Sequence, residues 1–258
     1  MDLGLAGRIA LIAGGSKGIG LACAQALAAE GARIAIVSRS AANVALALIE
    51  LPGAVGVCAD LADATGALGA LDQIEAQLGP VDILVNCAGA ARRTPPDELD
   101  PGAYRAAMDA KFFTYVNLVD PAVKRMAARR AGVIVNVIGN GGKAASPVHV
   151  PGGAANAALM LATAGLAAAY AGRGVRIVAV NPGLTGTGRV AEGLAADSRL
   201  AGIGEEEARA RAIARIPMGR MARPQEIAAM VTFLASDQAS YVTGVSISMD
   251  GAAAPMVV

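Results

Sequence analysis

Short apolar runs alternate along this chain with longer segments in which apolar residues recur at helical spacing. The first run, Ile9 to Ile12, is typical of a strand buried on both faces, and it leads through a glycine-rich turn into a helix that carries Ile19, Leu21 and Leu27. A second run follows, so the chain opens with a strand, helix, strand unit whose crossover is right-handed in nearly all proteins. The pattern predicts strands at residues 9–12, 33–37, 55–59, 81–85, 133–137 and 175–180, and a helix at residues 68–78.

The turn after the first strand holds glycines in the spacing G-x-x-x-G-x-G. Gly14, Gly18 and Gly20 allow backbone N–H groups to approach a pyrophosphate, and the following helix adds the positive end of its dipole. Ser16 and Lys17 lie within the same turn. Glycines at a helix start also serve purely as turns, so the rest of the chain has to decide between the two interpretations.

Composition favours a single α/β domain over residues 1–258. No Pro/Gly/Ser-rich linker or charge run divides the 258 residues. Hydrophobic residues make up 55% but aromatic ones only 3%, so the core has to be closely packed Ala, Val, Leu and Ile. The net charge is +1 with scattered Lys and Arg, which predicts neither a nucleic-acid partner nor a membrane partner.

Three further segments narrow the class of protein. The stretch Ala154 to Ala171 is mostly alanine and contains Asn156, so we expect a buried or interface helix rather than a membrane span. The N-terminus has no secretory signal pattern. Cys23, Cys58 and Cys87 have no C-x-x-C spacing and no histidine cluster, which fits a reducing cytoplasm and predicts no metal site.

The end of the second predicted strand bears on the choice of nucleotide. A site that prefers NAD(H) is expected to carry an acid there for the ribose 2′-hydroxyl. This chain has Ser38 and Arg39 instead, and a small residue followed by arginine suits the 2′-phosphate of NADP(H). Lys17 in the glycine turn could reach the same phosphate. Each cation alone is equally well explained as solvated surface charge, but together they favour NADP(H) over NAD(H).

Several motifs, spread from the glycine turn to the C-terminus, resemble those of one family. The segments AGGSKGIG, Asp60-Leu61 and NCAG, followed by NPGLTGT after the sixth predicted strand and by a matching C-terminal pattern, are similar to those of short-chain dehydrogenases/reductases. Two departures are mild: Ala13 stands for the usual Thr, and Cys87 for the second Asn of N-N-A-G. The resemblance covers almost the whole chain.

The resemblance implies a single-domain Rossmann fold, a doubly wound seven-stranded parallel sheet with a dinucleotide along its carboxyl edge. The cofactor-binding residues that it and the glycine turn imply are Gly14, Ser16, Lys17, Gly18, Ile19, Gly20, Ser38, Arg39, Asp60, Leu61, Asn86, Ala88, Gly89, Pro182, Gly183, Thr185 and Thr187.

The family's usual catalytic residues are absent. By the same resemblance, the Asn position falls on Lys111, the Ser position on Gly139, and the Tyr and Lys positions on Gly152 and Asn156. Two glycines remove the acid and the hydroxyl that positions the substrate, and general acid catalysis contributes about a hundred- to ten-thousandfold in rate. Lys111 and Asn156 nevertheless interchange the family's Asn and Lys, so the ammonium is transposed rather than lost.

Other residues near these positions have two interpretations. His149, the only histidine, lies three residues before Gly152 and could donate a proton, although a loop histidine needs no function. The glycines of residues 140–142 and 151–153 could offer backbone donors to an oxyanion, or could only shape turns. Arg92 and Arg93 could meet an acidic substrate, with surface solvation the simpler account.

These observations leave three functional hypotheses open. The first is an NADP(H)-dependent oxidoreductase for a small carbonyl or alcohol substrate, with Lys111, Asn156 and His149 as candidate catalytic residues. The second is a non-catalytic dinucleotide-binding homologue, and the third a lyase or isomerase that uses the glycine-rich donors. Residues 188–215 are expected to form a substrate lid. The small-residue helix at 153–171 and the helix holding Lys111 predict a homo-oligomer, a tetramer by the resemblance.

Overall fold

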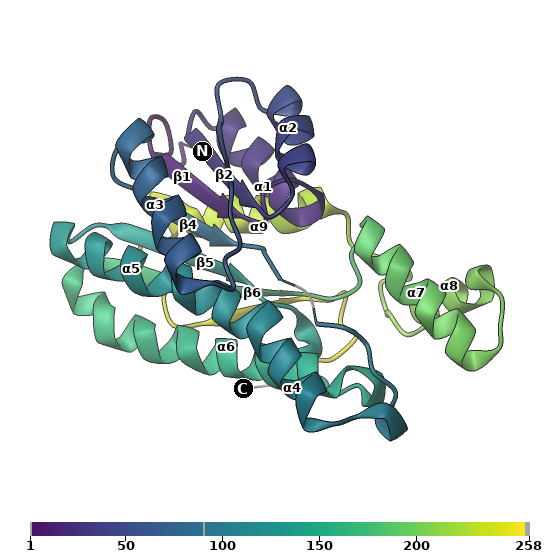
Figure 1. Cartoon of the computed structure of the whole chain (residues 1–258). Coiled ribbons are helices and arrows are strands. Elements are labelled where there is room, and N and C mark those ends of the chain that lie inside the picture. Colours follow the sequence, from purple (N-terminus) through teal and green to yellow (C-terminus); the bar gives the residue numbers. More distant parts are fainter. Residues whose placement is uncertain (1, 90, 256–258) are drawn as a thin grey trace.

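A computed structural model describes residues 2–89 and 91–255, without the side chains of residues 189, 192, 196, 199 and 200. Seven parallel strands form one sheet in the order β3-β2-β1-β4-β5-β6-β7 (Figure 1). The strands are β1 (Ile9–Ala13), β2 (Arg33–Ser38), β3 (Val55–Cys58), β4 (Ile83–Asn86), β5 (Gly132–Val137), β6 (Val175–Pro182) and β7 (Ser246–Met249). The order reverses between β1 and β4, which is where open α/β sheets bind ligands at the carboxyl ends of their strands.

The central strands are buried on both faces, as the continuous apolar runs predict. All five residues of β1 are buried, and β1 pairs with β2 from Ile9 opposite Arg33 and with β4 from Ala10 opposite Ile83. The predicted doubly wound seven-stranded parallel sheet is therefore confirmed.

Helices cover both faces of this sheet (Figure 1). Side chains of α1, α2 and α9 pack on one face, and those of α3, α5 and α6 on the other. The helices are α1 (Gly18–Ala29), α2 (Ala41–Glu50), α3 (Ala64–Leu78), α4 (Pro101–Ala107), α5 (Thr114–Arg129), α6 (Val150–Tyr170), α7 (Gly188–Ala201), α8 (Glu205–Ala214) and α9 (Pro224–Ala235). Short helical turns are η1 (Pro96–Glu98), η2 (Met108–Phe113), η3 (Asn140–Gly142), η4 (Pro147–His149), η5 (Ala171–Arg173) and η6 (Asp237–Ala239).

Two boundaries differ from the sequence pattern for identifiable reasons. Helix α3 begins at Ala64, four residues earlier than predicted, because the Asp63 carboxylate accepts hydrogen bonds from two N–H groups of the first turn. Strand β4 begins at Ile83 rather than at Val81. The Val81 N–H is taken by the Glu75 carboxylate at 3.0 Å and is not available to the sheet.

Helices α4 and α5 are joined by η2, a stretch of π-helix. Residues 101–129 thus form one continuous rod, and the wider π turn contains Lys111. Such π turns inside α-helices occur frequently at functional sites. Here the turn packs against α6, so the two predicted site helices lie side by side.

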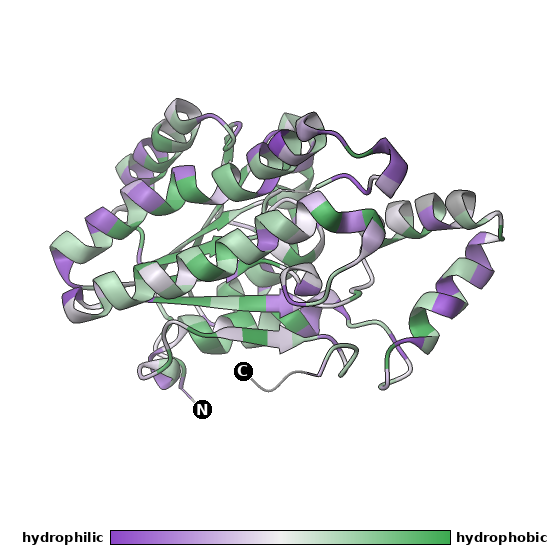
Figure 2. Cartoon of the chain, turned by 90° about the horizontal axis from the view of Figure 1, so that it is seen from below, coloured by the Kyte–Doolittle hydropathy of each residue, from purple (hydrophilic) through white to green (hydrophobic). Residues whose placement is uncertain are grey.

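Helix α6 is built almost entirely of small and apolar residues. One face packs on β6 and η3, and the outward face exposes alanines together with Leu161, whose exposed fraction is 76%. In Figure 2 this side of the molecule faces the viewer, and the helix is mostly pale to green. By length and composition alone the stretch Pro147–Arg173 could cross a membrane. In the structure α6 packs on β6 and belongs, with α3 and α5, to the layer of helices on one face of the sheet.

The segment after β6 leaves the body of the domain. Helices α7 and α8 pack against each other and project beyond the carboxyl ends of the strands (Figure 1). They occupy the region where the sequence predicts a substrate lid.

Candidate active site

The glycine turn after β1 is a close-packed backbone crossing. Gly14 has φ +74°, and a β-carbon there would lie 2.7 Å from the backbone nitrogen of Ala88. A β-carbon on Gly20 would collide with the carbonyl oxygen of Gly14, while Gly18 has φ +58° and only Thr187 nearby, at 3.4 Å. Only glycine fits these positions, and the open side of Gly18 faces the start of the projecting segment. The residues present therefore fit a dinucleotide pyrophosphate.

The end of β2 lies directly beside this turn. The Ser16 hydroxyl is 3.0 Å from that of Ser38, so a hydrogen bond joins the glycine turn to the second strand. Lys17 is the residue before α1, and both Lys17 and Arg39 are exposed. The structure thus places the two predicted cations on solvent-facing positions at the same edge of the sheet.

The predicted residues after β3 and β4 lie at the same edge but mostly form structural contacts. The Asp60 carboxylate accepts a hydrogen bond from the Ala62 N–H at 3.0 Å, and Leu61 is buried. Asn86 donates to Asn136 at 2.9 Å, and Asn136 donates to Thr163 at 3.0 Å. This buried chain of two amides and one hydroxyl joins β4, β5 and α6.

The NPGLTGT segment is fixed against the last strand. The Gly183 N–H donates to Met249 at 2.9 Å, and a β-carbon on Gly183 would be 2.8 Å from the Asp250 backbone. Thr185 is buried and bonds back to the Gly183 carbonyl at 3.2 Å. Pro182, which ends β6, completes the set of predicted residues that line this edge.

The space beside Gly152 is filled by His149. A β-carbon on Gly152 would collide with Cε1 of His149, lie 2.5 Å from its Nε2, and come within 2.8 Å of Ala91. A β-carbon on Gly141 would lie 3.2 Å from Cδ2 of the same ring. The imidazole therefore lies between the backbone of α6 at Gly152 and that of η3 at Gly141. The sequence alone left open whether His149 donates a proton or is a loop histidine without a function.

Asn156 fills the neighbouring space. Its Nδ2 atom would be 3.5 Å from a β-carbon on Gly139 and 3.4 Å from one on Gly141. Gly142 packs so closely on α6 that a β-carbon would lie 2.7 Å from the Ala157 nitrogen. The glycines of η3 thus allow the turn to press on the helix, with the carboxamide between them.

Lys111 reaches inward from the π turn. Its ammonium donates to the Tyr115 hydroxyl at 3.2 Å and lies 4.8 Å from the centre of that ring. Tyr115 is fully buried and donates in turn to the Val137 carbonyl at 2.5 Å, at the end of β5. A β-carbon on Gly89 would be 3.3 Å from the Lys111 Cα, so this turn also packs on the NCAG loop. Sequence patterns did not single out Tyr115, because one tyrosine on a helix is typical of an ordinary core residue.

The electrostatic environment of His149 is unfavourable to its charged form. Burial lowers the pKa of its imidazole below 6.5, and the positive charges of Arg93 and Lys111 lower it further. Its Nδ1 atom is buried, with no hydrogen-bond partner in the part of the chain that the structure describes. The ring is therefore uncharged at neutral pH.

Arg93 joins the site to α7. Its guanidinium forms an ion pair with Asp197 and lies against Gly193, both on that helix. The Thr94 N–H, next in the chain, donates to the Val148 carbonyl at 3.0 Å, which fixes this loop to the turn that carries His149. The sequence favoured simple solvation of Arg93. No local pattern could have indicated a partner 104 residues away.

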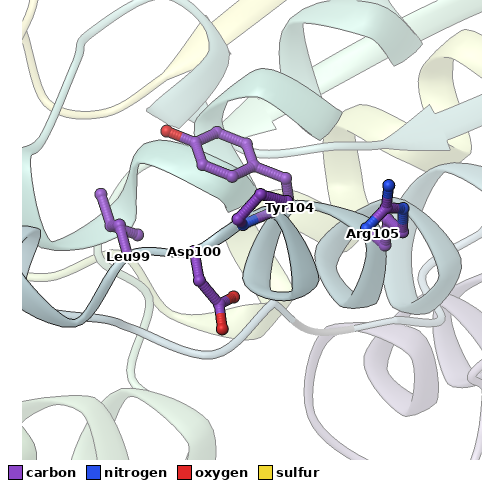
Figure 3. A pocket seen from close by; sticks show the side chains of 5 residues that line it. Leu99, Asp100, Tyr104 and Arg105 are labelled. Carbon is purple, nitrogen blue, oxygen red and sulfur yellow. The ribbon is translucent and has the colours of Figure 1, made fainter.

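Three further observations concern residues outside the group formed by His149, Asn156, Lys111 and Arg93. A shallow pocket beside α4 is lined by Leu99, Asp100, Pro101, Tyr104 and Arg105 (Figure 3), none of them a predicted site residue. The pKa of the Cys23 thiol is raised by a hydrogen bond with Cys87 and by burial, which keeps it protonated. Within residues 2–89 and 91–255, no three His, Cys, Asp or Glu side chains gather as metal ligands would.

Comparisons with known proteins extend across the whole chain. A family model described as enoyl-(acyl carrier protein) reductase matches residues 13–252. Cis-4-hydroxycyclohexanecarboxylate dehydrogenase of Sinomonas cyclohexanicum is 37% identical over 258 residues, covering 97% of this chain and 98% of that protein.

Solved structures of two reductases are also similar to this chain over nearly its whole length. An actinorhodin polyketide ketoreductase variant with NADPH has a TM-score of 0.93 and 28% identity, covering 96% of this chain and 98% of that one. L-sorbose reductase of Gluconobacter frateurii, complexed with NADPH and L-sorbose, has a TM-score of 0.92 and 27% identity over the full length of both chains. With a family model, a relative and a fold that all agree, the chain belongs to the short-chain dehydrogenase/reductase family.

Proposed function

We propose that this protein is an NADP(H)-dependent oxidoreductase that transfers hydride between the nicotinamide and a small alcohol or carbonyl compound. The observation that carries the proposal is the pairing of two features at one sheet edge. The glycine turn that fits a dinucleotide is intact, and the imidazole of His149 lies over Gly152, the family's tyrosine position. Named relatives that act on small alcohols and sugars support the same reaction class.

The preference for NADP(H) rests on the end of β2. An acid that could accept a hydrogen bond from the ribose 2′-hydroxyl is replaced there by Ser38 and Arg39, and Lys17 extends from the adjoining turn. Two exposed cations suit a phosphate, which takes charge-assisted hydrogen bonds. The ketoreductase and L-sorbose reductase structures both contain NADPH, which supports this class of nucleotide.

In the proposed reaction His149 handles the proton. During alcohol oxidation the uncharged imidazole accepts the hydroxyl proton as the C–H hydride leaves, and in reduction the imidazolium returns it to the carbonyl oxygen. When bound, the nicotinamide supplies the hydride acceptor or donor. The lowered pKa of His149 keeps the accepting form dominant at neutral pH.

Lys111 and Asn156 have positioning parts in this proposal. The Lys111 ammonium is held by Tyr115 at 3.2 Å, and its charge favours partial negative charge on the substrate oxygen. The Asn156 carboxamide lies between Gly139 and Gly141, where it can hold a hydroxyl of substrate or ribose. Neither group replaces the missing tyrosine by itself.

A second candidate function is dinucleotide binding without turnover. It is favoured by one specific observation: glycines at 139 and 152 supply no hydroxyl, and η3 packs directly on α6. A rate without the usual acid could be too low to serve a cell.

Two measurements on the purified protein separate these functions. The first titrates NADPH and NADH by fluorescence, and the second follows nicotinamide absorbance with a panel of secondary alcohols, ketones and imines. We expect tighter NADPH binding and turnover of at least one class. Tight NADPH binding with no absorbance change across the panel would support the non-catalytic function, and product formed without an absorbance change would indicate lyase or isomerase chemistry.

A further inference from the structure

The position of Arg93 at the site is fixed by two contacts of its own loop. Ala91 lies against Gly152, within 2.8 Å of where a β-carbon would stand. Thr94 is tied through its N–H to Val148, the residue before His149, at 3.0 Å. Arg93 lies between these two anchors. The backbone of Arg93 is therefore fixed between the residue that packs on Gly152 and the residue bonded to the turn of His149.

The guanidinium of Arg93 is held in place before any substrate arrives. Its Nη1 donates to Asp197, and Cζ, Nε and Nη2 are 3.5–3.6 Å from where a β-carbon on Gly193 would lie. Only 32% of the Arg93 side chain and 34% of the Asp197 side chain are exposed. An arginine presents five N–H donors in a rigid fork, so one carboxylate partner does not exhaust them.

The two charges that lower the pKa of His149 are both positive. They are Arg93 on the loop after β4 and Lys111 in η2, and each disfavours the imidazolium. An anion placed between them would cancel part of this effect. The arrangement therefore suits a substrate that carries negative charge a few bonds away from its reacting oxygen.

We propose that the substrate of this site is a hydroxy- or keto-carboxylic acid whose carboxylate is bound by Arg93 while its oxygen faces His149. This assignment rests on the proposed function for the identity of the reacting group. One relative is a dehydrogenase of cis-4-hydroxycyclohexanecarboxylate, and that compound is a hydroxycarboxylic acid. Bound carboxylate would raise the pKa of His149 and so favour the proton that carbonyl reduction requires.

The test compares a carboxylate with its uncharged isostere. Binding of 4-hydroxycyclohexanecarboxylate, cyclohexanecarboxylate and the two corresponding amides is measured by calorimetry on the full-length protein saturated with NADP⁺. We expect the carboxylates to bind more tightly than the amides. Arg93→Gln should abolish that difference, a loss of about ten- to a hundredfold in carboxylate affinity.

Arg92→Gln is the matched control. It removes the same charge from the next residue, which is exposed, and should leave the preference for carboxylate in place. Equal affinity for carboxylates and amides in the wild type, or equal losses in Arg92→Gln and Arg93→Gln, would overturn the proposal.

The only histidine of the chain supplies a second readout that needs no turnover. Its imidazole NMR resonance, followed over pH, should report a higher pKa with bound carboxylate than with bound amide, and no such difference in Arg93→Gln. An unchanged pKa in the wild type with the carboxylate bound would place the anion elsewhere. Carboxylate preference without any redox turnover would retain this assignment and contradict the proposed oxidoreductase.

Discussion

The imidazole of His149 occupies the space that any side chain at position 152 would need. A β-carbon on Gly152 would lie 2.5 Å from Nε2 of His149, closer than non-bonded carbon and nitrogen atoms pack. The present position of the imidazole therefore requires a glycine at position 152.

We predict that Gly152→Ala destabilises the protein by about 1–3 kcal/mol, the usual cost of overpacking. The cost should shrink in a His149→Ala background, where only Ala91 at 2.8 Å remains in the way. Urea unfolding of both single variants and the double variant gives the coupling energy. Gly69→Ala on α3, where nothing lies within 4 Å, is the control and should be neutral or stabilising. Additive effects at 149 and 152 would contradict the contact.

The rate of alcohol oxidation should depend on the pKa of His149. Because burial and two cations lower that pKa below 6.5, the accepting form increases as pH rises through this lowered value and is constant at neutral pH and above. Initial rates across the acid range test this. His149→Gln should lower the plateau by about a hundred- to ten-thousandfold and remove the acid inflection. An inflection only on the alkaline side would point to a different base.

The same shift acts on stability with a defined sign. Between the lowered folded pKa and the unfolded value near 6.5, the unfolded chain binds the proton and the folded one does not. The free energy of unfolding should therefore decrease as pH falls below about 6.5, and this component should level off below the folded pKa. His149→Gln should lose this component and retain the rest of the acid profile.

NADPH should bind more tightly than NADH because of the cations at the end of β2. Arg39→Ala removes one charge-assisted partner of the 2′-phosphate, worth about 1.5–3 kcal/mol, and should reduce NADPH affinity by roughly ten- to a hundredfold with NADH affinity unchanged. Fluorescence titration measures both. An unchanged preference in Arg39→Ala, or equal wild-type affinities, would remove the 2′-phosphate from this position.

How much could be predicted from the sequence depends on how local the information is. The strands and the glycine turn follow from periodicity and spacing within a few residues, so the sheet and the turn at Gly14 were predictable. The contents of the catalytic space were not. Whether the His149 side chain points into the catalytic space depends on the backbone of η4. The ion pair of Arg93 with Asp197 depends on how α7 packs on the rest of the domain. Long-range packing decides both.

Lys111→Met should strongly lower turnover and leave NADPH affinity nearly intact. The ammonium lies between the π turn and Tyr115, and the variant removes its charge while keeping an apolar chain of similar length. Lys124→Met is the control, because Lys124 is an exposed lysine of the same rod, paired with Asp120. Steady-state kinetics and cofactor titration are compared for both variants. Full activity in Lys111→Met would assign no part to this group.

The outward face of α6 should lie between subunits. Its alanines allow close approach of a second helix, and Leu161 is 76% exposed on that face. We expect a tetramer by light scattering at micromolar concentration, and Leu161→Glu should produce smaller species. A monomeric wild type under these conditions would contradict the prediction.

The proton-transfer group proposed here does not reside on the long helix that carries the family's tyrosine position. His149 belongs to a turn whose neighbour Val148 is bonded to Thr94, and Arg93 in that loop is paired with Asp197 of the projecting helix. Residues far apart in the sequence, on α7 and in the turn before α6, therefore share one line of contacts. A displacement of α7 would be transmitted through Arg93 and Thr94 to the turn that holds the imidazole.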